Sequence, residues 1–286
     1  MNQPAAIVHH SYGKSRVRLT KVTRHPDRHD LKEISVEILL EGDFESSYLT
    51  GDNRMVVPTD TMKNTVYAIA AQHPLDANES FAMALVEHFL ARHAQVSAAV
   101  VAIEETPWRR IEAAEGGRHP HAFVAAGTTR RTCRVRGDRG LPTVEAGVSG
   151  LTVVKTTGSA FRDFVRDEYT TLPDTDDRIF GTAVEACWRY TAGFTPDWNA
   201  VWDAACRTMV DVFAAHHSLA VQQTLHAIGQ AVLDGCAGIE EISLEMPNQH
   251  RIPVDLTGFG LPNTNSIFVT TSEPYGVIRA TLRRKE

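Results

Sequence analysis

Hydrophobic and polar residues form strand-like patterns in two successive stretches near the start of the chain. Residues 15–22 and 33–40 both have the pattern of a β-strand, and in the second stretch Ile34, Val36 and Ile38 recur with a period of two. Strand patterns return at residues 96–103 and 132–136. The first half of the chain is therefore predicted to begin and end with strands.

Between these strands, hydrophobic residues recur at the spacing of two helices. The side chains that share a helical face are Met62, Val66 and Ile69 in the first helix and Phe81, Leu85 and Phe89 in the second. Pro74 ends the first helix. Asp76 and Glu79 have the spacing of a capping box, so they predict the start of the second.

The second half of the chain repeats this order. Strand patterns cover residues 144–156 and 184–190, and later residues 242–246, 266–270 and 277–282. Two helices lie between the two groups, and their predicted N-terminal caps are Thr195 and Ser218. Their hydrophobic faces comprise Val201, Ala205, Met209 and Val212 in one helix and Val221, Leu225, Ile228 and Val232 in the other.

The chain thus has two ββααββ repeats, with a joint near residues 137–140. We predict two domains, residues 11–139 and 140–286. Because the strands come in adjacent pairs, the pattern favours an α+β fold, with antiparallel sheets covered by helices on one face, over a parallel sheet. Such sheets often close into a barrel by pairing their edges between subunits, so we expect an oligomer.

The composition is that of an ordinary globular protein. Of 286 residues, 43% are hydrophobic and 22% are charged. The net charge of −6 argues against nucleic acid as the main partner. The longest hydrophobic run, residues 98–103, is far shorter than the roughly 20 residues of a membrane helix, and the start lacks a secretory signal. We expect a cytoplasmic protein that does not bind membranes.

Linear motifs for a nucleotide cofactor or a metal are missing from the sequence. It contains no glycine-rich nucleotide fingerprint, no nucleophile elbow and no His-Glu-x-x-His helix. The four cysteines stand singly, so we interpret them as reduced, mostly buried thiols. His119 and His121 could share a strand face and bind a metal, but no nearby carboxylate or cysteine completes a site. An enzyme with this sequence is expected to use no cofactor and no metal.

Several short segments, spread in order over nearly the whole chain, form a joint pattern. They are Tyr12–Lys14, Val57–Tyr67, His119–Phe123, Gly150–Thr157, Arg166–Leu172, Asp177–Ile179, Val221–Thr224 and Pro247–His250. Each segment alone is unspecific, but together they resemble the urate oxidase (uricase) family.

The resemblance implies a fold and an activity. The family's fold is two tandem tunnelling-fold domains, each ββααββ, which agrees with the repeat in the hydrophobic pattern. The resemblance also implies a homotetramer with active sites between subunits. Its implied reaction, part of purine degradation, oxidises urate with dioxygen and water to 5-hydroxyisourate and hydrogen peroxide, without a cofactor or a metal.

Four residues are implied by the resemblance to bind the purine. Arg178 offers a planar fork of donors to the edge of a flat anion, and the Gln222 amide offers both a donor and an acceptor. Val221 would use its backbone N–H at a helix N-terminus, and Phe161 would stack on the ring. Without the resemblance, the alternatives are a surface salt bridge for Arg178, an exposed helix residue for Gln222, and core packing for Val221 and Phe161.

Five further residues are implied to complete the site: Lys14, Thr59 and His250 as catalytic residues, and Thr59, Asp60 and Asn248 as substrate-binding residues. Lys14, Thr59 and His250 match a proton relay, in which burial could lower the pKa of the Lys14 ammonium and the Thr59 hydroxyl passes the proton. Lys14, Thr59 and Asp60 would lie on one subunit and face the purine-binding residues of another. Asn248 would hold dioxygen or the attacking water. The alternatives are a helix cap for Thr59, a half-buried strand histidine for His250 and a turn residue for Asn248.

The sequence departs from the family pattern at two positions, Pro58 and Ala220, neither of which removes a catalytic residue. The chain ends without a Ser-Lys-Leu tripeptide, so no peroxisomal address is expected. The rival hypothesis is a catalytically silent purine- or pterin-binding protein of the same fold. The retained Lys14, Thr59 and His250 argue against it, because binding alone requires no proton relay.

Overall fold

The structure is a computed structural model that describes residues 5–271 and 273–285. The chain forms two compact units. Unit 1 runs as far as Gly147 and also includes Arg189–Trp198, whereas unit 2 comprises Val148–Trp188 and the chain from Asn199 onward.

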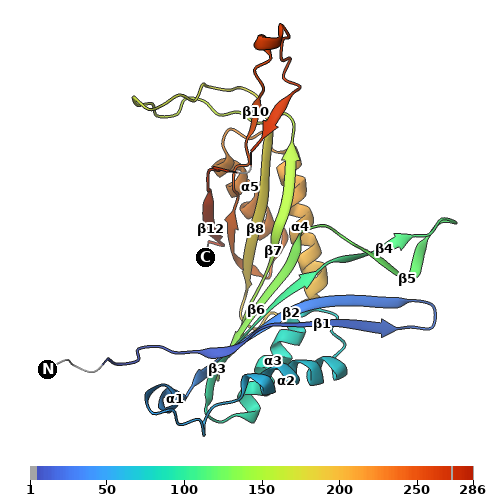
Figure 1. The fold of residues 1–286 in the computed structure, drawn as a ribbon, viewed down its shortest axis with the longest axis vertical. Helices are drawn as coiled ribbons and strands as arrows, with labels where there is room; N and C mark the ends of the chain where they lie inside the picture. The colour runs from blue at the N-terminus through green and yellow to red at the C-terminus, as the bar shows by residue number, and fades with distance from the viewer. Residues whose placement is uncertain (1–4, 272, 286) are drawn as a thin grey trace. The chain divides into compact units, whose positions relative to one another are not determined.

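Unit 1 is built on antiparallel strands in the order β1-β2-β3-β6 (Figure 1). Their bounds are Tyr12–Arg24 for β1, His29–Gly42 for β2, Val96–Thr106 for β3 and Arg130–Gly137 for β6. Three helices follow β2: α1 (Glu45–Leu49), α2 (Thr59–Gln72) and α3 (Asn78–Arg92). Helix α2 packs on β1, and α3 packs on β3 and β6.

Alternating side chains of these strands form the core of unit 1. Val36, Ile38 and Leu40 of β2 are fully buried, as are Met62 and Val66 of α2. The buried side chains of α3 include Phe81, Leu85 and Phe89. Burial of each large apolar side chain contributes about 1.5–3 kcal/mol, so the predicted hydrophobic faces hold these layers together.

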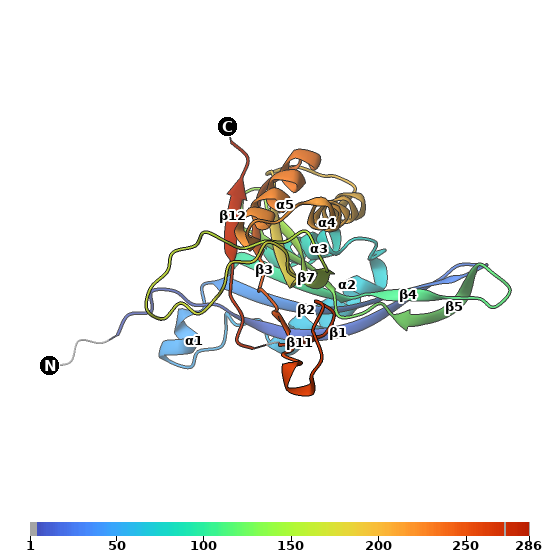
Figure 2. The same cartoon turned by 90° about the horizontal axis from the view of Figure 1, so that it is seen from above.

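A two-stranded arm is inserted between β3 and β6. It consists of β4 (Trp108–Glu112) and β5 (Arg118–Ala125), and it runs beside the β1–β2 hairpin in both views (Figures 1 and 2). The Trp108 indole donates to Glu33 at 3.3 Å, and the Arg110 guanidinium pairs with Asp30. Polar contacts therefore attach the arm to the hairpin.

The second half of the chain repeats the same order of elements, with strand order β7-β8-β9-β12. Most of these residues form unit 2, but the start of β7, the end of β8 and the first residue of α4 belong to unit 1. The bounds are β7 (Thr143–Lys155), β8 (Phe180–Tyr190), α4 (Trp198–Ala215), α5 (Val221–Gly235), β9 (Ile239–Glu245) and β12 (Arg279–Arg283). A second insertion, between β9 and β12, contains β10 (Arg251–Pro253), η1 (Thr257–Phe259) and β11 (Phe268–Thr270). Both units thus carry their extra hairpin between the last two strands of the repeat.

The predicted α+β class is confirmed, and so is the doubled ββααββ order. Within each unit the strand order is open, so neither unit closes into a barrel by itself among the described residues. Barrel closure on oligomerisation stays a prediction, as do the domain limits 11–139 and 140–286.

The predicted helix caps are wrong. Helices α3, α4 and α5 begin at Asn78, Trp198 and Val221, not directly after Asp76, Thr195 and Ser218. In α3 the N-cap residue is Ala77, and Glu79 does not complete a capping box. Its carboxylate is fully buried and lies 2.8 Å from the Arg131 guanidinium. Burial raises the pKa of Glu79, and the Arg131 charge opposes that shift. A tertiary ion pair has therefore displaced the local cap.

Two further observations concern the whole chain. All four cysteines are free thiols, but only Cys133 and Cys236 are buried, so the prediction of mostly buried thiols holds for half of them. In residues 5–271 and 273–285, no helix is both long and apolar enough to cross a membrane.

Candidate active site

The predicted site residues divide between the two units. Unit 1 holds Lys14, Thr59 and Asp60, and unit 2 holds Phe161, Arg178, Val221, Gln222, Asn248 and His250. Each group has its own supporting contacts.

Lys14 lies on β1 immediately before a β-bulge. The register of the β1–β2 pair shifts between Lys14 and Val17, and Arg16 adopts a left-handed φ of 57°. Gly13 approaches β2 so closely that a Cβ atom there would lie 1.7 Å from the Ile38 carbonyl oxygen. Bulges re-aim side chains and are common beside active sites. The half-buried Lys14 is therefore positioned by a local irregularity that only glycine at position 13 permits.

Thr59 is the first residue of α2, and a tyrosine ties its segment to β1. The Val57 N–H donates to the Tyr12 hydroxyl at 2.7 Å, and the same hydroxyl donates to the Val57 carbonyl at 3.1 Å. Tyr12 stands two residues before Lys14, and Val57 stands two residues before Thr59. The Tyr12 phenol thus links the two relay residues within unit 1.

The structure at the start of α2 shows that Thr59 does not cap this helix. The N-cap residue is Pro58, and no side chain caps this helix. Asp60 accepts hydrogen bonds from Lys63 and Asn64 on the next turn. The Lys63 hydrogen bond lowers the pKa of Asp60, and the nearby Lys14 charge lowers it further. The structure therefore brings Lys14 and Asp60 into electrostatic range of each other.

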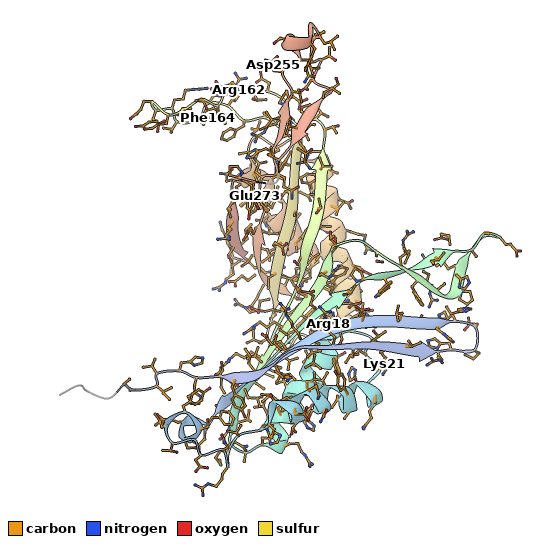
Figure 3. All side chains as sticks on the ribbon, in the orientation of Figure 1. Arg18, Lys21, Arg162, Phe164, Asp255 and Glu273 are labelled. Carbon is orange, nitrogen blue, oxygen red and sulfur yellow. The ribbon has the colours of Figure 1, made fainter. Side chains whose placement is uncertain are left out.

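The loop between β7 and β8 carries Phe161 and Arg178, whose side chains lie together. The guanidinium carbon of Arg178 is 5.2 Å from the centre of the Phe161 ring. Phe161 and Thr175 exchange backbone hydrogen bonds of 2.8 and 2.9 Å, which close the base of the loop. Beyond this base the loop extends away from the helices of unit 2, with Arg162 and Phe164 on it (Figure 3). Phe164 stacks on Phe161 at 4.9 Å.

Arg178 is a half-buried cation without a counterion among the described residues. The two aspartates before it are already engaged: Asp176 pairs with Arg162, and Asp177 accepts the Thr157 hydroxyl at 2.7 Å. The Thr157 hydrogen bond is the main cause that lowers the pKa of Asp177. Burial lowers the pKa of Arg178 itself. A desolvated guanidinium of this kind favours an anionic partner, so the surface salt bridge is not its role in this chain.

The start of α5 presents Val221 and Gln222. Val221 is buried and Gln222 is exposed. The side chain of the neighbouring Gln223 folds back, and its amide oxygen Oε1 accepts the Leu219 N–H at 2.9 Å. Gln223 therefore stabilises the turn before α5. The Gln222 amide has no such partner in the described chain and is available to a ligand.

Asn248 and His250 lie on a segment that is held through its backbone. The Asn248 N–H donates to Gly276 at 2.8 Å, and the Gln249 N–H donates to Gly181 at 2.9 Å. The Arg251 guanidinium donates to the Gln249 carbonyl at 3.0 Å. Both predicted side chains are half-buried and directly precede β10.

Six of the seven predicted polar residues share one property; the exception is Asp60, which Lys63 and Asn64 engage. No protein hydrogen bond or ion pair engages their side chains within the described part of the chain; they are Lys14, Thr59, Arg178, Gln222, Asn248 and His250. Buried or half-buried polar groups normally find protein partners. A polar ligand requires polar side chains that have no protein partner. The catalytic and binding roles of these six residues stay predictions.

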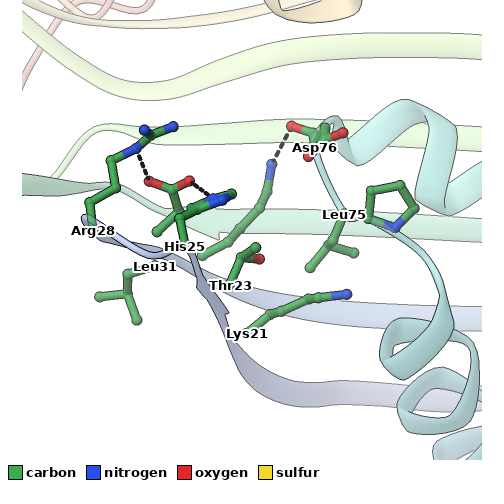
Figure 4. A pocket seen from close by; sticks show the side chains of 10 residues that line it. Lys21, Thr23, His25, Arg28, Leu31, Leu75 and Asp76 are labelled. Carbon is green, nitrogen blue, oxygen red and sulfur yellow. Dashed lines mark hydrogen bonds and ion pairs between the residues drawn. The ribbon is translucent and has the colours of Figure 1, made fainter. Parts of the chain in front are cut away.

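A pocket of about 520 Å³ lies elsewhere in unit 1, between β1, β2 and the end of α2 (Figure 4). Its cations already have partners: the Lys21 ammonium donates to the Ala70 carbonyl at 2.8 Å, and Lys32 lies 3.2 Å from Glu105. Asp30 joins His25 at 2.8 Å and Arg28 at 3.6 Å. No predicted site residue lines this pocket, and no charged group in it is left for an anion.

The histidine pair that the sequence suggested for a metal does meet in space. The rings of His119 and His121 are 4.6 Å apart, and His29 lies 6.0 Å from His121. Within residues 5–271 and 273–285, no group of three or more histidines, cysteines or carboxylates is arranged to hold a metal ion.

Comparison with known proteins identifies the family. The Uricase family model matches residues 10–136 and 144–279, which include all nine predicted site residues. The chain belongs to the uricase family. Its members are enzymes, so the prediction of an oxidoreductase, a urate oxidase, is confirmed at the level of the family.

Individual uricases resemble this chain over nearly its whole length. The uricase of Arthrobacter globiformis is 41% identical over 274 residues, which cover 96% of this chain and 88% of the relative. The uricase of Oryctolagus cuniculus is 36% identical over 290 residues, 99% of this chain and 96% of the relative. The crystal structure of the Arthrobacter globiformis uricase has a TM-score of 0.94 to this chain at 40% identity, covering 99% and 96% of the two chains.

Sequence reasoning missed the residues that hold the uricase site together. Tyr12, Asp177, Ser218 and Thr224 all lie within or beside the segments that carry the family resemblance. Their supporting contacts join residues far apart in the chain, such as Tyr12 and Val57. The resemblance marked the segments, but only the three-dimensional structure shows which atoms these residues hold.

Proposed function

We propose that this chain oxidises urate with dioxygen and water to 5-hydroxyisourate and hydrogen peroxide. Urate loses two electrons to dioxygen, which leaves as hydrogen peroxide with two protons. The oxygen of water enters the purine at carbon 5. The observation that carries the proposal is the half-buried Arg178 guanidinium, which has no counterion in the described chain and lies beside the Phe161 ring in a member of the uricase family.

The residues of unit 2 suit a planar purine anion. The Arg178 fork matches a carbonyl oxygen and a ring nitrogen on one edge, and the Gln222 amide matches an amide edge. The Val221 N–H lies at the start of α5, where backbone donors favour negative charge. Phe161 would provide the stacking surface for the purine ring, with the Arg178 guanidinium beside it.

The proton relay removes and returns protons around the oxidation step. Lys14 accepts a proton through the Thr59 hydroxyl, which can donate and accept in turn, and His250 orients Lys14. Asn248 holds dioxygen or the attacking water through its amide. Triplet dioxygen reacts slowly with closed-shell molecules, but the electron-rich urate dianion is itself a reductant. We therefore propose that the reaction needs no cofactor and no metal.

We further propose a homotetramer whose active sites are shared by two chains. Lys14, Thr59 and Asp60 would come from unit 1 of one chain, and the purine-binding residues from unit 2 of another. Exposed hydrophobic side chains in unit 2 support such contacts: Val165 and Tyr169 in the β7–β8 loop are 95% and 83% exposed, and Phe259 near β10 is 77% exposed. Contacts with another chain would remove the apolar surface of these side chains from water.

A direct assay tests the activity. Purified, metal-stripped protein is mixed with urate, and the loss of the urate ultraviolet band, oxygen uptake and peroxide release are followed together. We expect one oxygen consumed and one peroxide formed per urate. Urate binding without oxygen uptake would support the silent-binder hypothesis instead. Activity that vanishes with a chelator and returns with an added metal would overturn the cofactor-free mechanism.

A further inference from the structure

A pair of buried hydroxyl groups lies directly behind the predicted purine-binding residues of unit 2. The side chains of Ser218 and Thr224 are both fully buried. The Thr224 hydroxyl donates to the Ser218 oxygen at 2.8 Å, and the Ser218 hydroxyl donates to the Ala220 carbonyl at 3.1 Å. Together they form a short chain of hydrogen bonds that ends on the residue before Val221.

The Ala220 carbonyl determines where the Val221 N–H points. The two groups belong to the same planar, trans peptide unit, so they point in opposite directions. The Ala220 carbonyl also accepts the Thr224 N–H at 3.2 Å, the first hydrogen bond of α5. Holding this oxygen toward the hydroxyl pair therefore turns the Val221 N–H away from the pair, to the side where the helix start is open.

Ser218 also joins the other binding segments through its backbone. Its N–H donates to the Gly158 carbonyl at 2.9 Å, and its carbonyl accepts the Ala160 N–H at 2.7 Å. Ser159, the residue between Gly158 and Ala160, accepts the Arg178 N–H at its carbonyl, at 2.7 Å. The segments that carry Phe161, Arg178 and Val221 consequently meet around Ser218.

The two hydroxyls at this helix start do not act as an N-terminal cap. The N-cap residue is Ala220, which has no side chain to cap the helix. A serine or threonine at the N-cap position would satisfy an N–H of the first turn. In α5 the hydroxyls of Ser218 and Thr224 instead donate toward the Ala220 carbonyl. The first N–H groups of the helix are left without a side-chain cap. The first N–H groups of α5 are therefore available to a ligand, as they are at any helix start without a side-chain cap.

We propose that Ser218 and Thr224 are positioning residues for substrate binding: their hydroxyl pair aims the Val221 N–H and the adjoining Gln222 at the purine. The inference rests on the proposed function, because it names what holds the binding half of that site. Neither hydroxyl touches the substrate. Their loss is expected to weaken purine binding more than it slows the chemical step.

The test compares Thr224→Val with the wild type, using urate for turnover and xanthine, a purinedione without the 8-oxo group, for binding. Loss of the hydrogen bond should raise both the KM for urate and the Kd for xanthine about tenfold, with kcat changed less than about twofold. Thr224→Ser keeps the hydroxyl and should restore both affinities to within about twofold of the wild type.

Two further variants separate positioning from folding. Thr182 is another fully buried threonine of unit 2, and its hydroxyl has no protein partner, so Thr182→Val should leave the KM and Kd unchanged. If Thr224→Val does not fold, Ser218→Ala provides the same test, because it removes the hydroxyl and keeps the backbone bonds. Circular dichroism confirms that each variant is folded.

The outcomes distinguish this inference from the proposed function. A wild type that does not oxidise urate contradicts the proposed function. If the wild type does oxidise urate, but a folded Thr224→Val or Ser218→Ala variant binds xanthine as tightly as the wild type, only the positioning role is overturned. An equal loss of affinity in Thr182→Val would also overturn it, because that variant removes no hydrogen bond.

Discussion

Lys14 and Arg178 are both half-buried cations without a salt bridge in the described chain, but their chemistry suits different tasks. Arginine stays protonated in proteins, so Arg178 can hold an anion throughout a reaction. Lys14 is the proposed proton acceptor, and the hydroxyl of Thr59 is proposed to pass the proton because it can both donate and accept. Binding is therefore assigned to Arg178 and proton transfer to Lys14.

The substitution Lys14→Met tests this assignment. It removes the proposed base and keeps a side chain of similar length, so kcat for urate should fall about 100-fold or more. Because Lys14 is not proposed to grip the purine, the Kd for xanthine should change less than about threefold. Steady-state oxygen uptake and xanthine titration measure the two quantities.

Lys32→Met is the matched control, because Lys32 is another half-buried lysine, on the adjacent strand of unit 1. Its kcat should match the wild type. Equal losses of kcat and of xanthine affinity in Lys14→Met would contradict the role of Lys14 as a base.

At the scale of elements, hydrophobic periodicity predicted every strand and helix that buries a continuous face. It missed the arm β4–β5, where most side chains are exposed or only half-buried and no alternation arises. It also misplaced the helix caps, because a distant residue such as Arg131 decides where the Glu79 carboxylate lies. Local patterns can predict layers, but they cannot predict contacts between residues far apart in sequence.

The same distinction applies to the site. The positions of Lys14 and Thr59 followed from a family resemblance, whereas the contact that joins their elements did not. The Tyr12 hydroxyl bridges β1 to the segment before α2 across 45 positions of sequence. Burial raises the pKa of Tyr12, so the phenol stays neutral and can both donate to and accept from Val57.

Tyr12→Phe should therefore loosen the relay without touching the purine-binding residues. Both hydrogen bonds to Val57 are lost, and we expect kcat to fall about tenfold while the Kd for xanthine stays within about twofold. Tyr67→Phe is a matched control, because the Tyr67 hydroxyl also reaches from α2 to β1, at 3.4 Å from the Arg18 carbonyl. A folded Tyr12→Phe with wild-type kcat, or an equal effect in Tyr67→Phe, would refute the link.

At the scale of the whole molecule, the division of the predicted site between two compact units has a functional meaning. In the proposed mechanism, unit 1 would supply Lys14 and Thr59 of the relay, and unit 2 would supply the groups for the purine, together with Asn248 and His250. Each half of the doubled ββααββ repeat would thus carry only part of the proposed site. If the active sites lie between subunits, no single chain completes its own site.

Subunit mixing tests this central claim most directly. Chains with Lys14→Met and chains with Arg178→Gln, each with a different affinity tag, are produced separately and together, and mixed assemblies are isolated through both tags. Each variant alone should be nearly inactive. In assemblies with shared sites, random pairing places both intact halves together in about one quarter of the sites, so about a quarter of the wild-type urate turnover should return. Mixed assemblies that stay as inactive as their parents would show that Lys14 and Arg178 serve the same site from one chain.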